Sequence, residues 1–291
     1  SSNLSDERLS ELAELAEIVA DEHCPQGRVE PEEIARANEL TFNYGRYRDY
    51  FDGLLEHKSG RFHIYCNLDR VEYPESGRAH FTMAHELGHY FIDEHRNALM
   101  AGAAPSHPSF CEHESKLLVE MEADHFASNL LMPEGRFRKV CERKRVGLGS
   151  ILELTKLFGT SITSTALRYT KLDIVPCAIF KWSNNGKLQW RWMSTDTFRA
   201  RFGSTVQLAT ELPSDSPTAK AMRGESPPSG SYFEAGTTVS AWFRKVWDNS
   251  YRNDIMIEQS IALGRFGTLS FLYPDRGNYT FSADRWHGLN K

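Results

Sequence analysis

The pentapeptide at residues 85–89, His-Glu-Leu-Gly-His, groups three side chains that could carry chemistry. His85 and His89 are four residues apart, so on a helix they lie one above the other on the same face. Two imidazoles placed in this way can hold one zinc ion. Glu86 lies one residue round the helix and can reach a water on that ion. The spacing therefore predicts a metal centre with Glu86 as its catalytic base.

A plainer interpretation is a helix that carries two histidines on its surface. The apolar residues around the motif argue against it, because a largely buried helix needs a reason to hold paired histidines. These flanking residues are Phe81, Met83, Ala84, Leu87, Phe91 and Ile92.

A catalytic zinc usually has three protein ligands and one open position, so a third ligand is needed. A second helix is predicted over 117–132, ending near Pro133. Glu120 and Asp124 fall on its apolar stripe, where carboxylates are costly unless they are paired or bind metal. Glu120 as the ligand, with Asp124 accepting a hydrogen bond from a ligating histidine, would satisfy both. The apolar members of the stripe are Leu117, Ala127 and Leu131.

Two other residues compete with Glu120 for the third ligand position. Glu122 is close in sequence, but its face carries His125 and Asn129 and is more polar. His95 has the spacing of H-E-x-x-H-x-x-G-x-x-H, in which the glycine bends the chain back to the metal. Ile92 occupies the glycine position here, so we expect the helix to continue and to carry His95 past the metal.

H-E-L-G-H followed some thirty residues later by E-x-E-A-D-x-F-A-x-x-L-L-M-P resembles the ImmA/IrrE metallopeptidases. The resemblance covers about 60–135 well and weakens towards 172. It implies a core similar to thermolysin-like (gluzincin) peptidases, with His85, His89 and Glu120 as ligands and Glu86 as the catalytic base. It also implies cleavage of cytoplasmic transcriptional repressors, which releases stress-response or mobile-element genes.

Composition is typical of a soluble globular protein, with 291 residues, 40% hydrophobic and 25% charged. A net charge of −5 disfavours a protein whose main task is to grip nucleic acid, so direct DNA binding is not expected. Five scattered cysteines without a C-x-x-C motif fit a reducing cytoplasm. No apolar run reaches the length of a membrane span, and the N-terminus lacks the layout of a secretory signal. We therefore expect a cytoplasmic protein without membrane contact.

The elements around the motif follow from local patterns. Helices are predicted from Ser5 and from Pro31. Alternation over 61–68, after the turn at 58–60, predicts a hairpin strand, to which a peptide substrate could add as an extra strand. The metal helix is expected to run over 77–94. The stretch 97–114 is interpreted as a long loop, in which His107 or His113 could polarise a substrate carbonyl.

Two predicted helices over 152–172, joined by a tight turn at Gly159, resemble a helix-turn-helix. A helical hairpin that closes the metal domain explains them equally, because the second helix offers only Arg168 and Lys171 for reading bases. A basic run precedes them and could contact a repressor, DNA or only solvent. Its members are Arg136, Arg138, Lys139, Arg143, Lys144 and Arg145.

Beyond Pro176 the pattern becomes strand-rich. A hairpin is expected over 178–192, a mobile loop over 213–230, a strand running into a helix over 239–247, and two strands over 254–261 and 268–273. The fold class is α+β: a mostly helical zincin-like metallopeptidase domain with a small sheet (1–150), a helix-turn-helix-like segment (151–173) and a mixed α/β C-terminal domain (174–291). The last could be a sensor, a substrate-docking domain or a structural appendage.

The leading hypothesis is a zinc-dependent, site-specific endopeptidase whose partner is a protein substrate, a DNA-binding repressor. Two histidines and one glutamate also accept Mn²⁺ or another divalent ion. The alternative is a metal-dependent regulator that binds DNA or a repressor without proteolysis. Glu86 argues against it, because a structural metal site needs no general base.

Overall fold

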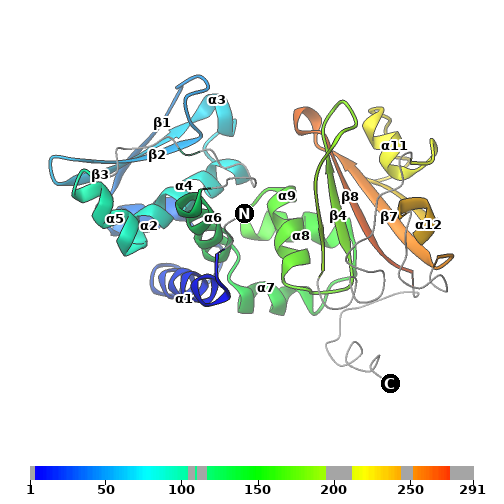
Figure 1. Ribbon diagram of the computed structural model, residues 1–291, viewed down its shortest axis with the longest axis horizontal. Helices are drawn as coiled ribbons and strands as arrows, with labels where there is room; N and C mark the ends of the chain where they lie inside the picture. Colours follow the sequence, from blue (N-terminus) through cyan, green and yellow to red (C-terminus); the bar gives the residue numbers. More distant parts are fainter. Residues whose placement is uncertain (1–3, 104–108, 110–116, 195–211, 244–251, 276–291) are drawn as a thin grey trace. The chain divides into compact units, whose positions relative to one another are not determined.

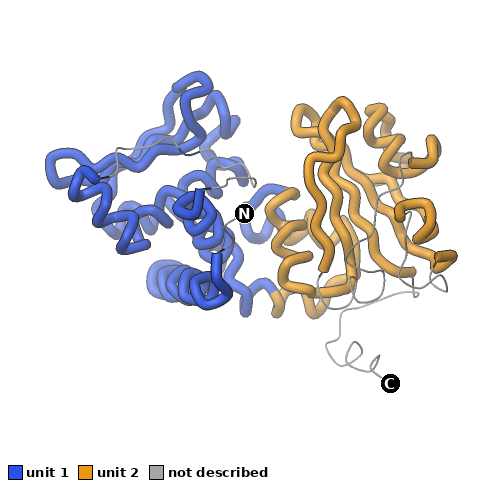
Figure 2. Tube along the Cα trace, in the orientation of Figure 1, with its two compact units in different colours: residues 1–137, 155–161 blue, residues 138–154, 162–291 orange. Residues whose placement is uncertain are grey.

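The computed structural model describes residues 4–103, 109, 117–194, 212–243 and 252–275 (Figure 1). By packing, the chain divides into two compact units, which are 1–137 with 155–161 and 138–154 with 162–291 (Figure 2). Among the helices of the described residues, none is long and apolar enough to cross a bilayer. The domain boundaries predicted at 150 and 173 stay predictions, because a division by packing does not establish which parts fold alone.

The first unit is built mainly from helices. The N-terminal helix begins where predicted, with the Ser5 hydroxyl accepting a hydrogen bond from the Arg8 amide at 3.2 Å. Within this unit α4 packs on α6, and α1 packs on the other side of α6. Its helices are α1 (Asp6–His23), α2 (Pro31–Ala37), α3 (Leu68–Val71), α4 (Gly77–Phe91), α5 (Asp93–Met100) and α6 (Leu118–Leu131). Two more, α7 (Glu134–Cys141) and α8 (Leu148–Phe158), are shared between the units.

A three-stranded sheet of order β1-β3-β2 lies against α4. The predicted hairpin is confirmed, with β2 (Gly53–Lys58) and β3 (Arg61–Asn67) antiparallel across a two-residue turn, whereas β1 (Thr41–Gly45) runs parallel to β3. The prediction that 61–68 could receive a peptide strand is wrong, because β3 is the central strand and is paired on both sides. Leu68 already belongs to α3. An incoming strand would have to add to an outer strand such as β2.

The second unit is organised around a five-stranded sheet of order β5-β4-β8-β7-β6, in which all neighbours are antiparallel. The predicted hairpin over 178–192 and the strands near 254–261 and 268–273 are confirmed. The elements of this unit are α9 (Ile162–Lys171), β4 (Ala178–Trp182), β5 (Leu188–Met193), α11 (Pro217–Met222), β6 (Phe233–Thr238), α12 (Val239–Trp242), β7 (Ile255–Ala262), η2 (Gly264–Phe266) and β8 (Thr268–Pro274).

Two expectations for the second unit need correction. The stretch 213–230 is not simply a loop, because Ser216 caps the helix α11 and Thr218 is fully buried. Its hydroxyl contacts Ser260 and Ser270 at 2.7 and 2.6 Å, which ties the helix to the sheet. Around 239 the strand ends earlier than predicted, at Thr238, and the short α12 follows.

An aromatic and aliphatic core fills the second unit on one side of its sheet. Trp242 donates its indole N–H to the buried Glu258 carboxylate at 2.9 Å, and the Thr218 amide donates to the other oxygen of that carboxylate. Large members of this core are Phe180, Trp182, Trp242, Phe243 and Met256. Together, the two units form the α+β arrangement that the sequence predicted, a mainly helical unit with a small sheet and a mixed α/β unit.

Candidate metal centre

Close packing of α4 on α6 brings the predicted site residues together. Gly88 is the contact point: a Cβ placed on it would lie 3.2 Å from the Cα of Ala123 and 3.2 Å from a ring carbon of Phe126. A residue without a side chain here allows the two helix axes to approach closely. Such an approach is needed because the ligand side chains from α4 and α6 must reach one point.

Three buried side chains converge between these helices. The Nε2 atoms of His85 and His89 are 3.2 Å apart. The carboxylate of Glu120 lies 3.3 Å from Nε2 of His85 and 3.4 Å from Nε2 of His89. All three side chains are at least nine-tenths buried, and among the described residues they form the one group of three or more metal-ligating side chains with donor atoms this close.

These separations fit a divalent cation bound to two nitrogens and one oxygen. Tetrahedral ligands at ~2.0–2.1 Å from a zinc ion lie about 3.3 Å from one another. The donor atoms of His85, His89 and Glu120 already have this spacing. A divalent metal site is thus consistent with the fold, and zinc as the particular metal remains a prediction.

Without metal, the three donors titrate as a coupled group. Burial lowers the pKa of His85, but its contacts with Asp124 and Glu120 outweigh burial and raise that pKa well above the ordinary value. For His89, burial dominates and lowers the pKa to about 4. Burial raises the pKa of Glu120, yet its contacts with the two histidines hold it far below the usual range. A negative carboxylate beside a histidine pair is an electrostatic environment suited to a cation.

Asp124 lies where the sequence placed it, behind His85. Its Oδ1 is 2.8 Å from Nδ1 of His85, so the ring donates from Nδ1 and turns its Nε2 lone pair towards the other donors. A carboxylate in this position fixes the tautomer and orientation of a metal-binding imidazole. The roles of Glu120 and Asp124 stay predictions, but both lie at the predicted point.

Glu86 is fully buried beside the histidines, and neither carboxylate oxygen hydrogen-bonds to any side chain or backbone group of the described residues. Burial and the neighbouring charge of Glu120 raise its pKa to about 7, against the opposing influence of His85 and of polar groups on Ser109 and Leu55. A buried carboxylate without a protein partner is costly. Its position and its pKa suit a general base that meets a water molecule.

The expected path of the chain after the motif is wrong. The α4 helix ends at Phe91, Ile92 adopts an extended conformation (φ −75°, ψ 110°), and a separate helix starts at Asp93. His95 is therefore not carried away but lies buried against His89, with the two Nδ1 atoms 3.1 Å apart. It reaches the side of the ring opposite to Glu120, so it lies behind the candidate ligand rather than among the donors.

Glu122, the other rival for the third position, also lies outside the donor group. Its Oε2 is 2.8 Å from Nε2 of His95, and its carboxylate is paired with Arg8. His107 and His113, considered as groups that polarise a carbonyl, lie outside the described residues.

A cavity of about 160 Å³ opens beside Glu86 and His89. Its other walls are mostly apolar and include Leu55 of β2 and residues of α5 and α6: Ala98, Leu99 and Val119. Apolar walls with a few convergent polar groups are typical of a site that binds a ligand.

Sequence reasoning missed Gly53, at the start of β2. A Cβ on this residue would lie 2.5 Å from Oε1 of Glu86, so only glycine lets the strand pass this close. The same residue pairs with Ser109 in an isolated bridge. The Asp52-Gly53 pair was interpreted as the start of strand structure, and no sequence signal ties it to Glu86.

Three comparisons with known proteins bear on this site. A search of curated proteins finds no match. Over most of its length, the fold is similar to a structure titled "Mycobacterium tuberculosis transcriptional regulator". That likeness has a TM-score of 0.57 at 12% identity and covers 92% of this chain and 78% of the other. It is a likeness of fold alone.

A family model described as Peptidase_M78, IrrE N-terminal-like domain, matches residues 72–170. This match spans both α4 and α6, which hold all three candidate ligands. The resemblance inferred from the sequence is thereby confirmed: residues 72–170 carry the IrrE N-terminal-like domain of the Peptidase_M78 metallopeptidase family.

Proposed function

We propose that the protein is a zinc-dependent endopeptidase of the cytoplasm that cuts one site in a DNA-binding repressor. The observation that carries the proposal is the placement of Glu86, a buried carboxylate without a hydrogen-bond partner among the described residues, next to a three-donor metal site. A site that only held a metal for structure would not need it. Peptide hydrolysis needs both a cation and a general base in contact with the same water.

His85, His89 and Glu120 would hold the ion in this mechanism. A divalent cation there supplies a Lewis acid, which polarises the scissile carbonyl and makes a water more acidic. Glu86 accepts the proton of the attacking water and then delivers it to the leaving amine. Burial keeps the Glu86 carboxylate poised for both steps, because a pKa near 7 lets the group take up and give back a proton at neutral pH.

An extended peptide fits the surroundings of this site. The β2 strand is an outer strand of its sheet, and it carries both Gly53, next to Glu86, and Leu55, in the cavity wall. A substrate strand added along β2 would place its backbone near Glu86. The apolar cavity beside His89 would then receive a substrate side chain.

The experiment compares wild type with Glu86→Gln for new N-termini in a lysate of the native host, with each protein loaded with metal. We expect one dominant cut in a DNA-binding regulator. With Glu86→Gln the cut should fall by roughly 10²–10⁴-fold while metal binding is kept. Glu142→Gln, at an exposed position, is the matched control and should cleave as wild type does. A Glu86→Gln protein that cleaves at the normal rate would disprove the mechanism.

A regulator that binds its partner without cutting is the second candidate, supported by the printed description of the structure with a similar fold. Direct reading of DNA by α9 is not favoured. Arg168 is 7% exposed, and the ammonium group of Lys171 lies 4.8 Å from the centre of the Trp192 ring. Absence of any cut, together with salt-dependent binding of the metal-loaded protein to a repressor or to DNA, would favour this candidate.

A further inference from the structure

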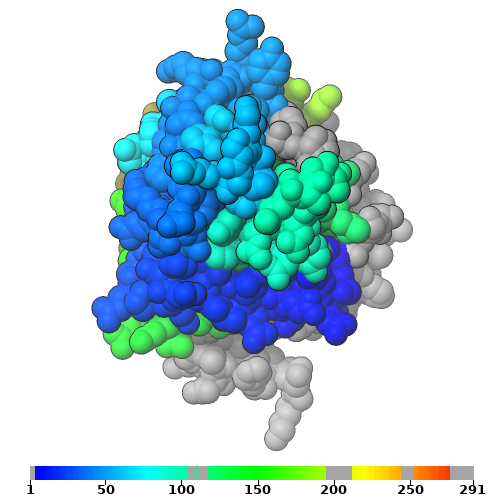
Figure 3. Space-filling view, turned by 90° about the vertical axis from the view of Figure 1, so that its left-hand side faces the viewer, coloured from blue at the N-terminus to red at the C-terminus, as the bar shows by residue number. Residues whose placement is uncertain are grey.

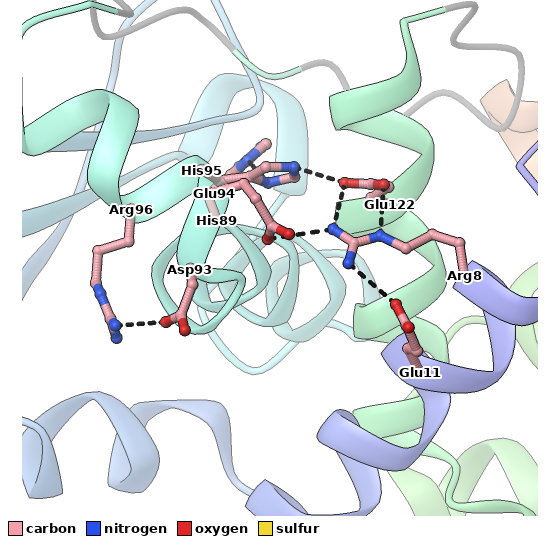
Figure 4. A network of polar contacts seen from close by, with 8 residues as sticks. All are labelled: Arg8, Glu11, His89, Asp93, Glu94, His95, Arg96 and Glu122. Atoms are coloured by element: carbon pink, nitrogen blue, oxygen red, sulfur yellow. Dashed lines mark hydrogen bonds and ion pairs between the residues drawn. The ribbon is translucent and has the colours of Figure 1, made fainter.

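A chain of three polar side chains runs outward from His89 (Figure 4). Its Nδ1 lies 3.1 Å from Nδ1 of His95, and Nε2 of His95 lies 2.8 Å from Oε2 of Glu122. Glu122 is in turn gripped by Arg8, from Nε to Oε1 at 2.8 Å and from the terminal nitrogen to Oε2 at 3.2 Å. The exposed fraction falls from 25% for the Arg8 side chain to 14% for Glu122 and 6% for His95.

The direction of every hydrogen bond in this chain is fixed from its outer end. A guanidinium only donates, and Arg8 engages both oxygens of Glu122, so that carboxylate is held ionised and accepts. His95 must then donate from Nε2, which leaves Nδ1 of its neutral ring as an acceptor. His89 must donate from Nδ1 to that acceptor. The lone pair of His89 Nε2 is left facing the other two donors.

We infer that Arg8, Glu122 and His95 are positioning residues for the metal centre, which hold His89 in the tautomer and orientation that bind a cation. The inference rests on the proposed metal site and deepens it. Each ligating histidine then has its own carboxylate. For His85 it is Asp124, in direct contact, whereas for His89 it is Glu122, acting through the intervening His95. Such outer partners typically contribute 10–100-fold in metal affinity.

This arrangement gives separate tasks to three acids of one helix. Successive residues of an α-helix are about 100° apart, so Glu120 and Glu122 point to different sides of α6. Glu120 faces α4 and the donor group, and Glu122 faces α5 and α1. The break at Ile92 is what allows α5 to turn back and place His95 between Glu122 and His89.

The first turns of α1 thereby become part of the metal site. Arg8 lies three residues after the helix cap and 114 residues before Glu122 in sequence. It also meets Glu11 and Glu94 at 3.4 and 3.3 Å, two acids that are 59% and 68% exposed. In the space-filling view, the dark blue of α1 and the blue-green of the segment around 90–103 adjoin on the surface (Figure 3). Glu11 and Glu94 touch the same arginine without belonging to the chain that ends at His89.

The test measures zinc affinity of the full-length protein by competition with a chromophoric chelator. Glu122→Gln should lower the affinity by about 10–100-fold, because an amide cannot accept from Arg8 and from His95 with both of its polar atoms. His95→Leu should lower it similarly while it keeps the Arg8–Glu122 pair, and it provides an independent variant if the first folds poorly. Glu11→Gln and Glu94→Gln are matched controls and should stay within about twofold of wild type.

Arg8→Met separates positioning from simple stability. It breaks the same link between α1 and α6 as Glu122→Gln, but it leaves the carboxylate facing His95. Unfolding of the metal-free variants should show comparable losses of stability for both, whereas the loss of zinc affinity should be several-fold larger for Glu122→Gln. The absorption bands of the Co²⁺-loaded protein should also shift in Glu122→Gln and His95→Leu, and stay unchanged in Glu94→Gln.

Two results would overturn the inference. One is a Glu122→Gln protein that binds zinc within twofold of wild type with an unchanged Co²⁺ spectrum. The other is a loss of affinity that follows the loss of metal-free stability equally in Glu122→Gln and Arg8→Met. Failure of wild type itself to bind a divalent ion would instead reject the proposed metal site. Binding without cleavage would leave this inference intact and reject only the peptidase activity.

Discussion

At the scale of single residues, Gly53 and Glu86 are the tightest contact of the site. A Cβ on Gly53 would lie 2.5 Å from Oε1 of Glu86 and 2.6 Å from Cγ2 of Thr82, both on the buried face of α4. Neither neighbour can move without disturbing that helix. The glycine therefore sets how closely β2, and any strand added to it, can approach the general base.

Gly53→Ala is predicted to impair cleavage more than metal binding. Displacement of Glu86 or of the strand by a fraction of an ångström should lower kcat/KM by roughly 10–100-fold, since misplacement of about 1 Å can cost 10². Zinc affinity should change little, because the donors lie on the other side of the Glu86 carboxylate. Overpacking should lower the free energy of unfolding by about 1–3 kcal/mol.

Gly135→Ala is a matched control for this substitution, because a Cβ there meets no atom within 4 Å. It should leave cleavage unchanged and stabilise α7 by up to about 1 kcal/mol. Steady-state kinetics and urea unfolding of both variants give the comparison. A Gly53→Ala protein with wild-type kinetics would show that β2 does not confine Glu86.

At the scale of elements, the break between α4 and α5 is the feature that local patterns did not predict. No glycine, proline or capping side chain lies at Ile92, and the apolar periodicity continues through it. A weaker signal was present in Asp93 and Glu94, since acids are favourable in the first turn of a helix. Tertiary packing supplies the rest: the buried Ile92 side chain and the contacts of His95 stabilise the bend.

The hairpin of β2 and β3 is an element whose turn was readable from the sequence. Lys58 pairs with Arg61, and the two residues between them, Ser59 and Gly60, both have positive φ values of 52° and 75°. Two positive values are typical of a type I′ turn, which prefers Asn-Gly and disfavours a Cβ at the second position. The turn therefore holds the register that carries Gly53 and Leu55 to the site.

Substitutions in this turn are predicted to have opposite effects. Gly60→Ala should lower the free energy of unfolding by about 1 kcal/mol, because alanine is strained in the left-handed conformation. Ser59→Asn should raise it by a few tenths of a kcal/mol, because asparagine tolerates that conformation. Chemical denaturation measures both. Equal effects of the two substitutions would mean that the turn has another conformation.

At the scale of the whole molecule, metal binding should couple to folding. The three donors come from two helices that are joined by more than twenty residues, so an unfolded chain cannot present them together. Zinc at 1,000 times its dissociation constant should then stabilise the folded chain by about 4 kcal/mol. We expect Tm to rise with zinc and to fall after treatment with a chelator.

His89→Gln should abolish this increase in Tm, whereas His125→Gln should retain it. His125 lies on α6 as well, but its ring nitrogen contacts the Leu9 carbonyl rather than the donor group. Differential scanning fluorimetry with and without zinc compares the two variants. An equal zinc effect in both would place the bound metal elsewhere in the chain.

The sequence by itself determined what depends on neighbours along the chain. Four-residue spacing on a helix fixes that His85 and His89 share a face, and the apolar stripe with two acids singled out Glu120 and Asp124. The same local rules predicted the hairpins and the class of fold. Family resemblance then joined the two motifs into one expected site.

Only the tertiary structure decided which distant residues complete that site. Gly53 against Glu86, His95 behind His89 and Arg8 on Glu122 are contacts between separate elements. Periodicity says which face of a helix is buried, but not which partner covers it, because that choice depends on packing of the entire unit. The strand accessible to a substrate was misassigned for the same reason, since sheet order is set by long-range pairing rather than by alternation within one strand.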